Sequence, residues 1–182
     1  MDPLSDVLAS VRLDGALYLD AEFTAPWCIV GKFGNESIRA RLGDLHIVYF
    51  HFLTEGACRV RLEEGGETLD VAAGDVVLFP RDDRHLLGTD LRLPPSGNAF
   101  LYSIADASDP DFIRMRLGGG GEPTRFVCAY LACGRTTIRP LIDALPRMLR
   151  IPMGDGGSST LVRELLRTGV RESRSTAPGA RT

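Results

Sequence analysis

The stretch of sequence that decides the fold is Gly74-Asp75-Val76-Val77-Leu78-Phe79-Pro80-Arg81-Asp82-Asp83-Arg84-His85. A Gly-Asp turn precedes an apolar run, and Pro80 ends that run because proline has no N–H to donate to a sheet ladder. His85 then stands at the start of the next apolar stretch. The pattern predicts a strand, a turn and a second strand that begins at a histidine.

Further short apolar stretches, separated by Gly, Pro and Asp, lie on both sides of this segment. Such spacing is typical of an antiparallel sandwich or barrel. Residues 45–53 lack a clean alternation of apolar and polar side chains, which predicts a central strand buried on both faces. The sequence between 63 and 67 predicts a tight hairpin around two glycines. The expected strands are 16–23, 27–33, 36–41, 45–53, 57–63, 67–71, 76–80, 85–92, 98–104 and 125–132.

Helical periodicity is confined to the two ends of the chain. Residues 2–13 predict an amphipathic helix with Asp2 as N-cap and Pro3 in its first turn. Residues 140–149 and 160–171 predict a C-terminal helical pair, in which Pro146 must bend or restart the first helix. Glycines and prolines predict loops at 93–97 and 105–124. We therefore expect a β-sandwich or barrel with its N-terminal helix at 1–135, a helical extension at 136–172, and a flexible tail or linker start at 173–182.

Composition excludes several classes of protein. The chain has 182 residues, of which 44% are hydrophobic and 25% charged, and 21 basic against 24 acidic residues give a net charge of −3. These values are those of a globular domain, and the charge gives no reason to expect nucleic-acid binding. Four scattered cysteines do not suggest a disulfide framework, and the acidic N-terminus is unlike a secretory signal. We expect a cytoplasmic protein that does not enter a membrane.

The segment from Gly74 to His85 resembles the second conserved motif of the cupin family: Gly, five residues, Pro, one residue, Gly, two residues, His. Asp82 takes the place of the second glycine. The upstream Phe52-Leu53-Thr54-Glu55-Gly56 is similar to the strand and turn that precede this motif in the same family. The resemblance implies a mainly β fold, the cupin-type β-barrel.

A wider resemblance connects the chain to the N-terminal effector-binding cupin domain of AraC-type transcription regulators. It spans most of residues 1–170, and five segments carry it: DPLSDVL near the N-terminus, residues 51–56, residues 74–85, residues 125–128 and residues 140–146. In that family two helix-turn-helix motifs that bind DNA follow the cupin domain. The chain stops about where those motifs would begin, so we expect it to bind no DNA by itself.

The resemblance implies a sensor that binds a small-molecule effector in its barrel and forms a homodimer. Candidate ligand-binding residues are Trp27, Tyr49, His51, Phe79, His85 and Tyr102. In the predicted helix at 160–171, an apolar stripe is the expected dimer or relay surface; it consists of Leu161, Val162, Leu165 and Leu166. The alternative to each prediction is that these side chains fill the protein's own core.

Two alternatives to the sensor remain open: a small metal-dependent cupin enzyme, such as an isomerase or dioxygenase, and a stand-alone binding protein. Metal-dependent cupins carry His-x-His and a Glu in their first motif, and this sequence lacks them, so we do not expect an enzyme. A different metal site, with His51, His85 and Cys128 as zinc ligands, is a hypothesis. Its alternative is a buried histidine bonded to a carbonyl and a cysteine that acts as a small hydrophobe.

Overall fold

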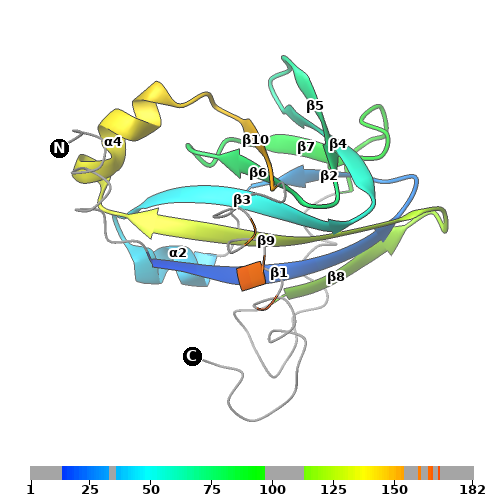
Figure 1. The fold of residues 1–182 in the computed structure, drawn as a ribbon, viewed down its shortest axis with the longest axis horizontal. Coiled ribbons are helices and arrows are strands. Elements are labelled where there is room, and N and C mark those ends of the chain that lie inside the picture. Colours follow the sequence, from blue (N-terminus) through cyan, green and yellow to red (C-terminus); the bar gives the residue numbers. More distant parts are fainter. Residues whose placement is uncertain are drawn as a thin grey trace, which may run out of the picture.

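The computed structural model describes residues 14–32, 36–96 and 113–153, together with positions 160, 164, 165 and 168. Its described elements are mainly strands, and Figure 1 shows them in two layers with the helices at one end. In chain order they are β1 (Asp14–Thr24), β2 (Cys28–Gly31), α2 (Glu36–Leu42), β3 (His46–Glu55), β4 (Ala57–Leu62), β5 (Thr68–Ala72), β6 (Asp75–Phe79), β7 (His85–Gly88), β8 (Ile113–Gly118), β9 (Pro123–Cys133), α4 (Arg135–Ala144) and β10 (Leu149–Pro152).

The described strands form two sheets. A 6-stranded sheet has the order β10-β6-β3-β9-β1-β8, and a 4-stranded sheet has the order β2-β7-β4-β5. Within the two sheets all described strand pairings are antiparallel except that of β1 with β8, which is parallel. The expected mainly β fold is confirmed, with a jelly-roll-like sandwich of two sheets in place of one closed barrel.

The strand predicted to be central is central. β3 lies between β6 and β9, and seven successive residues of it are buried. Its side chains alternate between two apolar clusters: Tyr49 and Leu53 lie in the large cluster between the sheets, which we call the inner core, and Phe50 and Phe52 lie in a cluster on the other face. A strand covered on both faces has no polar side to show in its sequence.

The hairpin between β4 and β5 also follows the sequence. Val60 is buried while Arg59 on the opposite face is exposed, as the alternation in this stretch predicts. Gly65 and Gly66 have φ of 100° each, a left-handed conformation that side chains disfavour. The turn therefore requires the two glycines that predicted it.

The strand predicted at 36–41 is wrong, because this segment forms helix α2. Its sequence, ESIRARL, consists largely of good helix formers, and Arg39 and Arg41 lie in the last turn, where positive charge interacts favourably with the helix dipole. Gly43, with φ of 55°, follows the helix in the left-handed conformation common after a helix end.

The first predicted C-terminal helix ends earlier than expected. α4 stops at Ala144, and Leu145 is extended with φ −83° and ψ 146°. The residue before a proline avoids the helical region, so Pro146 ends the helix instead of bending it. Of the predicted helix only its final residue, Leu149, belongs to β10, which pairs with β6 at the edge of the larger sheet.

The loop predicted at 105–124 is wrong at 113–118 and from 123 on, and is confirmed at 119–122, which form no helix or strand. Residues 113–118 form β8, in which buried Met115 lies opposite Ala21 of β1, and β9 begins at Pro123. Apolar residues at 113, 115 and 117 alternate with two arginines, a strand signal that was present in the sequence.

Several predictions lie outside the described residues: the N-terminal helix at 2–13, the strand at 98–104 and the tail at 173–182. The division into 1–135, 136–172 and 173–182 stays a prediction. No described helix has the length and apolar character needed to span a lipid bilayer.

Candidate functional site

The inner core is lined by aromatic rings from both ends of the described chain. The ring centroid of Trp27 lies 4.8 Å from that of Phe23 and 5.8 Å from that of Phe126. Phe126 in turn lies 5.5 Å from the ring of His51. These contacts give edge-to-face and stacked arrangements that stabilise aromatic clusters beyond their buried area. They connect Trp27 to the polar centre of the core.

That polar centre is a pair of buried histidines. His51 of β3 and His85 of β7 come from different sheets, with 1% and 0% of their surface exposed, and their Nε2 atoms lie 2.8 Å apart. The His85 ring stacks on Phe79 with centroids 3.5 Å apart. On another side Gly31 of β2 approaches so closely that a Cβ there would overlap the Nε2 atom of His85. Packing therefore fixes the His85 ring.

The hydrogen-bond network assigns a tautomer to each histidine. The Nδ1 atom of His85 lies 2.8 Å from the carbonyl oxygen of Asp83, which can only accept, so Nδ1 carries the proton and Nε2 accepts. His51 must then donate from Nε2 to His85. Its Nδ1, 2.9 Å from the Sγ atom of Cys128, accepts from the thiol. Tyr49 hydrogen-bonds to Cys128 at the far end.

The electrostatics agree with this assignment, in which both imidazoles are neutral. Burial lowers the pKa of His85 to about 3, against a smaller opposing effect of the Asp83 carbonyl. Burial also lowers the pKa of His51 well below its ordinary value, and the neighbouring His85 lowers it further. Burial raises the pKa of Cys128 to about 12, so the thiol stays protonated. The centre is a chain of neutral groups at physiological pH.

This geometry does not fit the zinc site that the sequence suggested. His51, His85 and Cys128 do lie together, but the two nitrogens of His51 face different partners, one the imidazole and the other the thiol. A zinc ion needs all its ligands within about 2.0–2.3 Å of one point. Within the described ranges, no three His, Cys, Asp or Glu side chains are placed to hold a metal ion.

One polar group of the inner core lacks a partner. Only 2% of Trp27 is exposed, and its indole nitrogen Nε1 is buried without a hydrogen-bond acceptor in the described structure. The backbone of Trp27 is well satisfied, since its N–H donates to the Thr89 hydroxyl and its carbonyl accepts from the Thr89 N–H. A buried N–H without an acceptor costs about 1–3 kcal/mol. Such a group is ready to bind an acceptor from a ligand.

The loop from Pro80 to His85 holds the histidine pair to the rest of the protein. Asp82, which replaces the motif glycine, has φ of 54°, and aspartate is one of the few residues that tolerates this conformation. Its carboxylate binds Arg39 of α2 at 2.6 Å. The carbonyl of Pro80 accepts from Nε2 of His46 at 2.6 Å. The motif that predicted the fold thus builds a turn tied to several elements.

The structure brings together most of the predicted ligand-binding residues. Trp27, Tyr49, His51, Phe79 and His85 all lie in or against the inner core. Tyr102 lies outside the described residues, as do Leu161, Val162 and Leu166 of the predicted relay surface. Leu165 is described and 62% exposed.

Two aromatic residues of the core were missed. Phe23 and Phe126 are fully buried beside Trp27, and both occur in stretches correctly predicted as strands. The alternation of each strand could have placed them on the inner face with Ala21 and Cys128.

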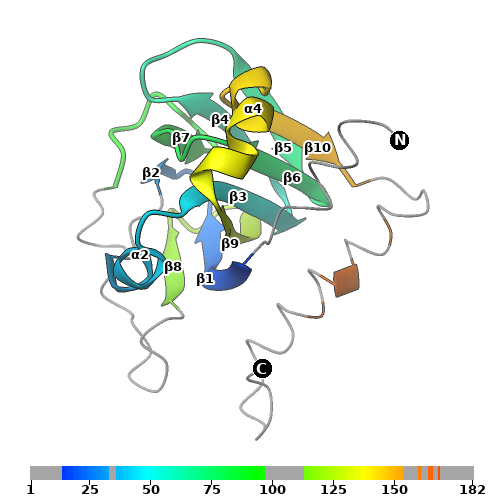
Figure 2. The same cartoon turned by 90° about the vertical axis from the view of Figure 1, so that its left-hand side faces the viewer.

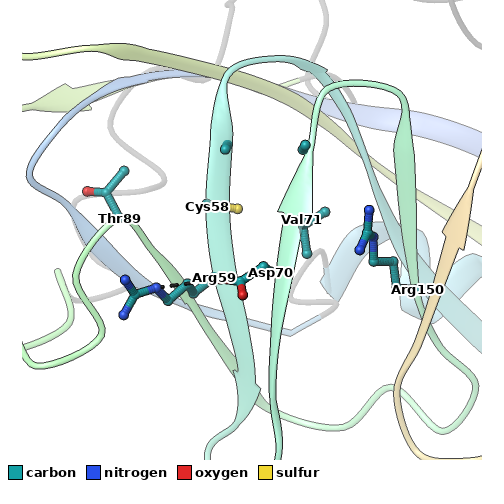
Figure 3. Close-up of a pocket in the computed structure, with 8 residues that line it drawn as sticks. Cys58, Arg59, Asp70, Val71, Thr89 and Arg150 are labelled. Atoms are coloured by element: carbon teal, nitrogen blue, oxygen red, sulfur yellow. Dashed lines mark ion pairs between the residues drawn. The ribbon is translucent and has the colours of Figure 1, made fainter.

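A pocket of about 330 Å³ lies over β4 and β5. Figure 3 shows Arg59 and Asp70 on one side of the pocket and Arg150 on the other. The Nε atom of Arg59 lies 3.6 Å from Oδ1 of Asp70. Arg150 also binds Asp75, at 2.8 Å. Both arginines are therefore already paired. The residues around the pocket are Ala57, Cys58, Arg59, Asp70, Val71, Ala72, Thr89 and Arg150.

The chain is similar in sequence to a protein family and to two proteins of known description. A family model described as cupin matches residues 2–182. A protein of Streptomyces antibioticus described as an AraC-like transcription regulator is 23% identical over 154 residues, which cover 85% of this chain and 45% of the relative. A second regulator of the same description, from Streptomyces lividans, is 22% identical over 152 residues, 84% of this chain and 44% of the relative. The chain thus spans less than half the length of these relatives.

Solved structures show weaker likeness. ToxT from Vibrio cholerae O395 has a TM-score of 0.39 at 7% identity, over 90% of this chain and 47% of that protein. Ectoine synthase from P. lautus has a TM-score of 0.33 at 12% identity, over 85% of this chain and 76% of that protein.

Proposed function

This chain belongs to the cupin family, and from that premise we propose that it is the ligand-sensing domain of an AraC-type transcription regulator. Its curated relatives are described as AraC-like transcription regulators, and it covers 45% and 44% of their lengths. In this proposal residues 1–182 bind the effector, and DNA binding is the task of another domain. The effector is a small molecule that enters the inner core.

The observation that carries the proposal is the unpartnered indole N–H of Trp27. It lies in an aromatic cluster next to two histidines that burial keeps neutral. The described inner core contains no Lys, Arg, Asp or Glu that would pair with a charged ligand. Burying a charge without a partner is far more costly than burying a neutral acceptor. The ligand is therefore an uncharged, largely apolar molecule with one acceptor oxygen for Trp27.

An enzymatic role is not favoured by the same geometry. His51 donates to His85, His85 donates to the Asp83 carbonyl, and Cys128 is a buried, protonated thiol. A nucleophile or general base needs a pKa nearer the working pH and access to substrate. These groups instead form a neutral packing element whose position a ligand can change.

Signalling requires that the ligand bind two conformations of the domain with different affinity. We place the output in the C-terminal helical region, with the stripe at Leu161, Val162, Leu165 and Leu166 as dimer or relay surface. The 62% exposure of Leu165 supports this part of the proposal. Light scattering tests it: the wild type is expected to be a dimer and Leu165→Asp a folded monomer. A monomeric wild type contradicts it.

The chain provides its own probe for ligand binding, because Trp27 is its one tryptophan. The test uses 2-decanone and decanoate, which have the same number of carbons but differ in charge, and follows tryptophan emission and the thermal midpoint. The ketone is expected to change both, and decanoate neither. In Trp27→Phe, thermal-shift titration should give roughly 2-fold to 12-fold weaker binding of the ketone, the value of one neutral hydrogen bond.

The matched control for Trp27→Phe is Phe50→Leu, which changes a ring in the cluster on the other face of the larger sheet. It should leave ketone binding unchanged. Tighter binding of decanoate than of the ketone, or no response to either compound at millimolar concentration, would overturn the proposed ligand class.

A further inference from the structure

The loop Pro80–His85 contacts α2 through Asp82 and α4 through Arg81. Figure 2 is turned so that the end of the molecule with these two helices faces the viewer. His85 donates to the carbonyl of Asp83, two residues back in this loop. A displacement of the His85 ring therefore acts directly on the peptide group of Asp83.

From Asp83 the contacts lead to the segment that follows α4. Its carboxylate accepts two hydrogen bonds from Arg147, at 2.6 and 3.2 Å, and only 15% of the Asp83 side chain is exposed. Arg147 lies between the end of α4 at Ala144 and the start of β10 at Leu149, and it also binds Glu64 at 2.8 Å. Paired, two-point contacts of this kind fix orientation as well as distance.

A second contact from the same loop holds α4 itself. Arg81 donates to the carbonyl oxygens of Ile142 at 2.8 Å and Leu145 at 3.1 Å. These carbonyls lie at the C-terminal end of a helix, where intrahelical donors are lacking and a positive charge interacts favourably with the helix dipole. α4 has no basic residue of its own in its last turn. Arg81 provides this charge from another part of the chain.

The loop has little freedom to absorb movement. Pro80 is tied to His46 of β3 and Asp82, only 10% exposed, to Arg39 of α2, whereas the Arg84–Glu63 pair is solvent-exposed on both sides and adds little to this rigidity. A short segment held at nearly every residue moves as a unit. Packed elements of this kind shift between discrete arrangements and do not deform gradually.

We infer that the loop Pro80–His85 couples the His51–His85 pair in the core to the C-terminal end of α4, through Arg81 and the Asp83–Arg147 ion pair. The inference rests on the proposed function in one respect: the displacement that starts at His85 is the one a ligand would cause. The coupling itself is a property of the domain and is measured without ligand. It gives the regulator a route from the inner core to the C-terminal region.

Hydrogen exchange of the amides of residues 142–145 tests the coupling in the full chain. His85→Leu removes the donor to Asp83 and is expected to raise their exchange about tenfold, as Arg81→Gln should on its own. In the double variant the two effects should not add, because both act on the same contact. Arg84→Gln is the matched control, since Arg84 ties the same loop to Glu63 rather than to α4. It should leave these amides unchanged.

The reciprocal measurement remains available if His85→Leu does not fold. Coupling acts in both directions, so Arg81→Gln and Arg147→Gln should shift the imidazole NMR signals of His51, whereas Arg84→Gln should not. The chain has three histidines, which keeps this spectrum simple.

Three results overturn the inference: unchanged exchange in His85→Leu, additive effects in the double variant, or equal effects of Arg84→Gln and Arg81→Gln. If His85→Leu does not fold, an unshifted His51 spectrum overturns it. Failure of the ketone titration leaves all these outcomes as they are, so the two proposals fail separately.

Discussion

Lowering the pH from about 7.5 to about 5.5 should destabilise this protein by about 1 kcal/mol through His85, with a further loss of the same sign through His51. Both are fully buried, with pKa values lowered by desolvation, that of His85 to about 3. In the unfolded chain each returns to a pKa near 6.5. Below that value the unfolded state binds protons that the folded state does not, so stability falls as pH falls.

The size of the His85 contribution follows from its unfolded pKa alone, because its folded pKa of about 3 lies below the window tested. A group that stays neutral in the folded state contributes about 1.36 kcal/mol per pH unit once the pH is below its unfolded pKa of about 6.5, so His85 contributes somewhat more than about 1 kcal/mol over this interval. His51 adds to this loss, because burial lowers its pKa as well. The loss stops only when the pH approaches the folded pKa of about 3 for His85. The carboxyl groups with lowered pKa values, Glu63 and Asp90, affect stability mainly below this window.

Urea denaturation at the two pH values measures the difference in the free energy of unfolding. The double variant His51→Leu/His85→Leu replaces both partners with apolar side chains of similar volume, and its stability should lose most of the pH dependence. His46→Gln is the control, because His46 is half-buried and bonds a carbonyl of the loop instead of lying in the core. It should keep the full dependence. A wild type whose stability is flat between these pH values, or a double variant as sensitive as the wild type, refutes the reasoning.

Three further predictions follow from the packing of the core. Gly31→Ala places a Cβ against the fixed ring of His85 and should cost about 1–3 kcal/mol in urea denaturation, whereas Gly43→Ala meets open space and should cost only the left-handed conformation, about 1 kcal/mol. All four cysteines are buried, so a thiol reagent at mildly alkaline pH should label none of them until the protein unfolds; rapid labelling of Cys128 in the native state would contradict the raised pKa. Protein prepared without chelator should contain less than about one zinc ion per ten chains and keep its thermal midpoint in EDTA, and a stoichiometric zinc ion that stabilises the fold would contradict the arrangement of His51.

Much of the fold could be predicted because its information is local. Alternation of apolar and charged residues in β4, the glycines of its hairpin and the unbroken apolar run of β3 each result from how one strand meets its surroundings. The same local signals were present for β8 but were outweighed by the glycines and Pro123 that follow it. At residues 36–41 the apolar positions are compatible with a strand or a helix, and the helix formers decided.

The candidate site could be predicted as a set of residues but not as an arrangement. His51 and His85 stood out in the sequence, as did Cys128, yet zinc coordination and a hydrogen-bonded chain require the same three residue types. Which of the two exists depends on where the two nitrogens of one ring point. Ring orientation is set by the neighbours Phe79, Gly31 and the Asp83 carbonyl, which belong to other segments.

The sequence by itself determined the mainly β class, the central strand and the turn that begins at Pro80, because the causes of each lie within a few residues along the chain. Only the tertiary structure decided that the histidines are neutral and bonded to each other, that the Trp27 N–H lacks an acceptor, and that Arg81 holds the end of α4. His51 and His85 are 34 residues apart, and Arg81 and Ile142 are 61 apart. Contacts between sheets, and the burial that shifts a pKa, depend on how separate elements pack. The spacing of residues within one element does not predict how close another element lies.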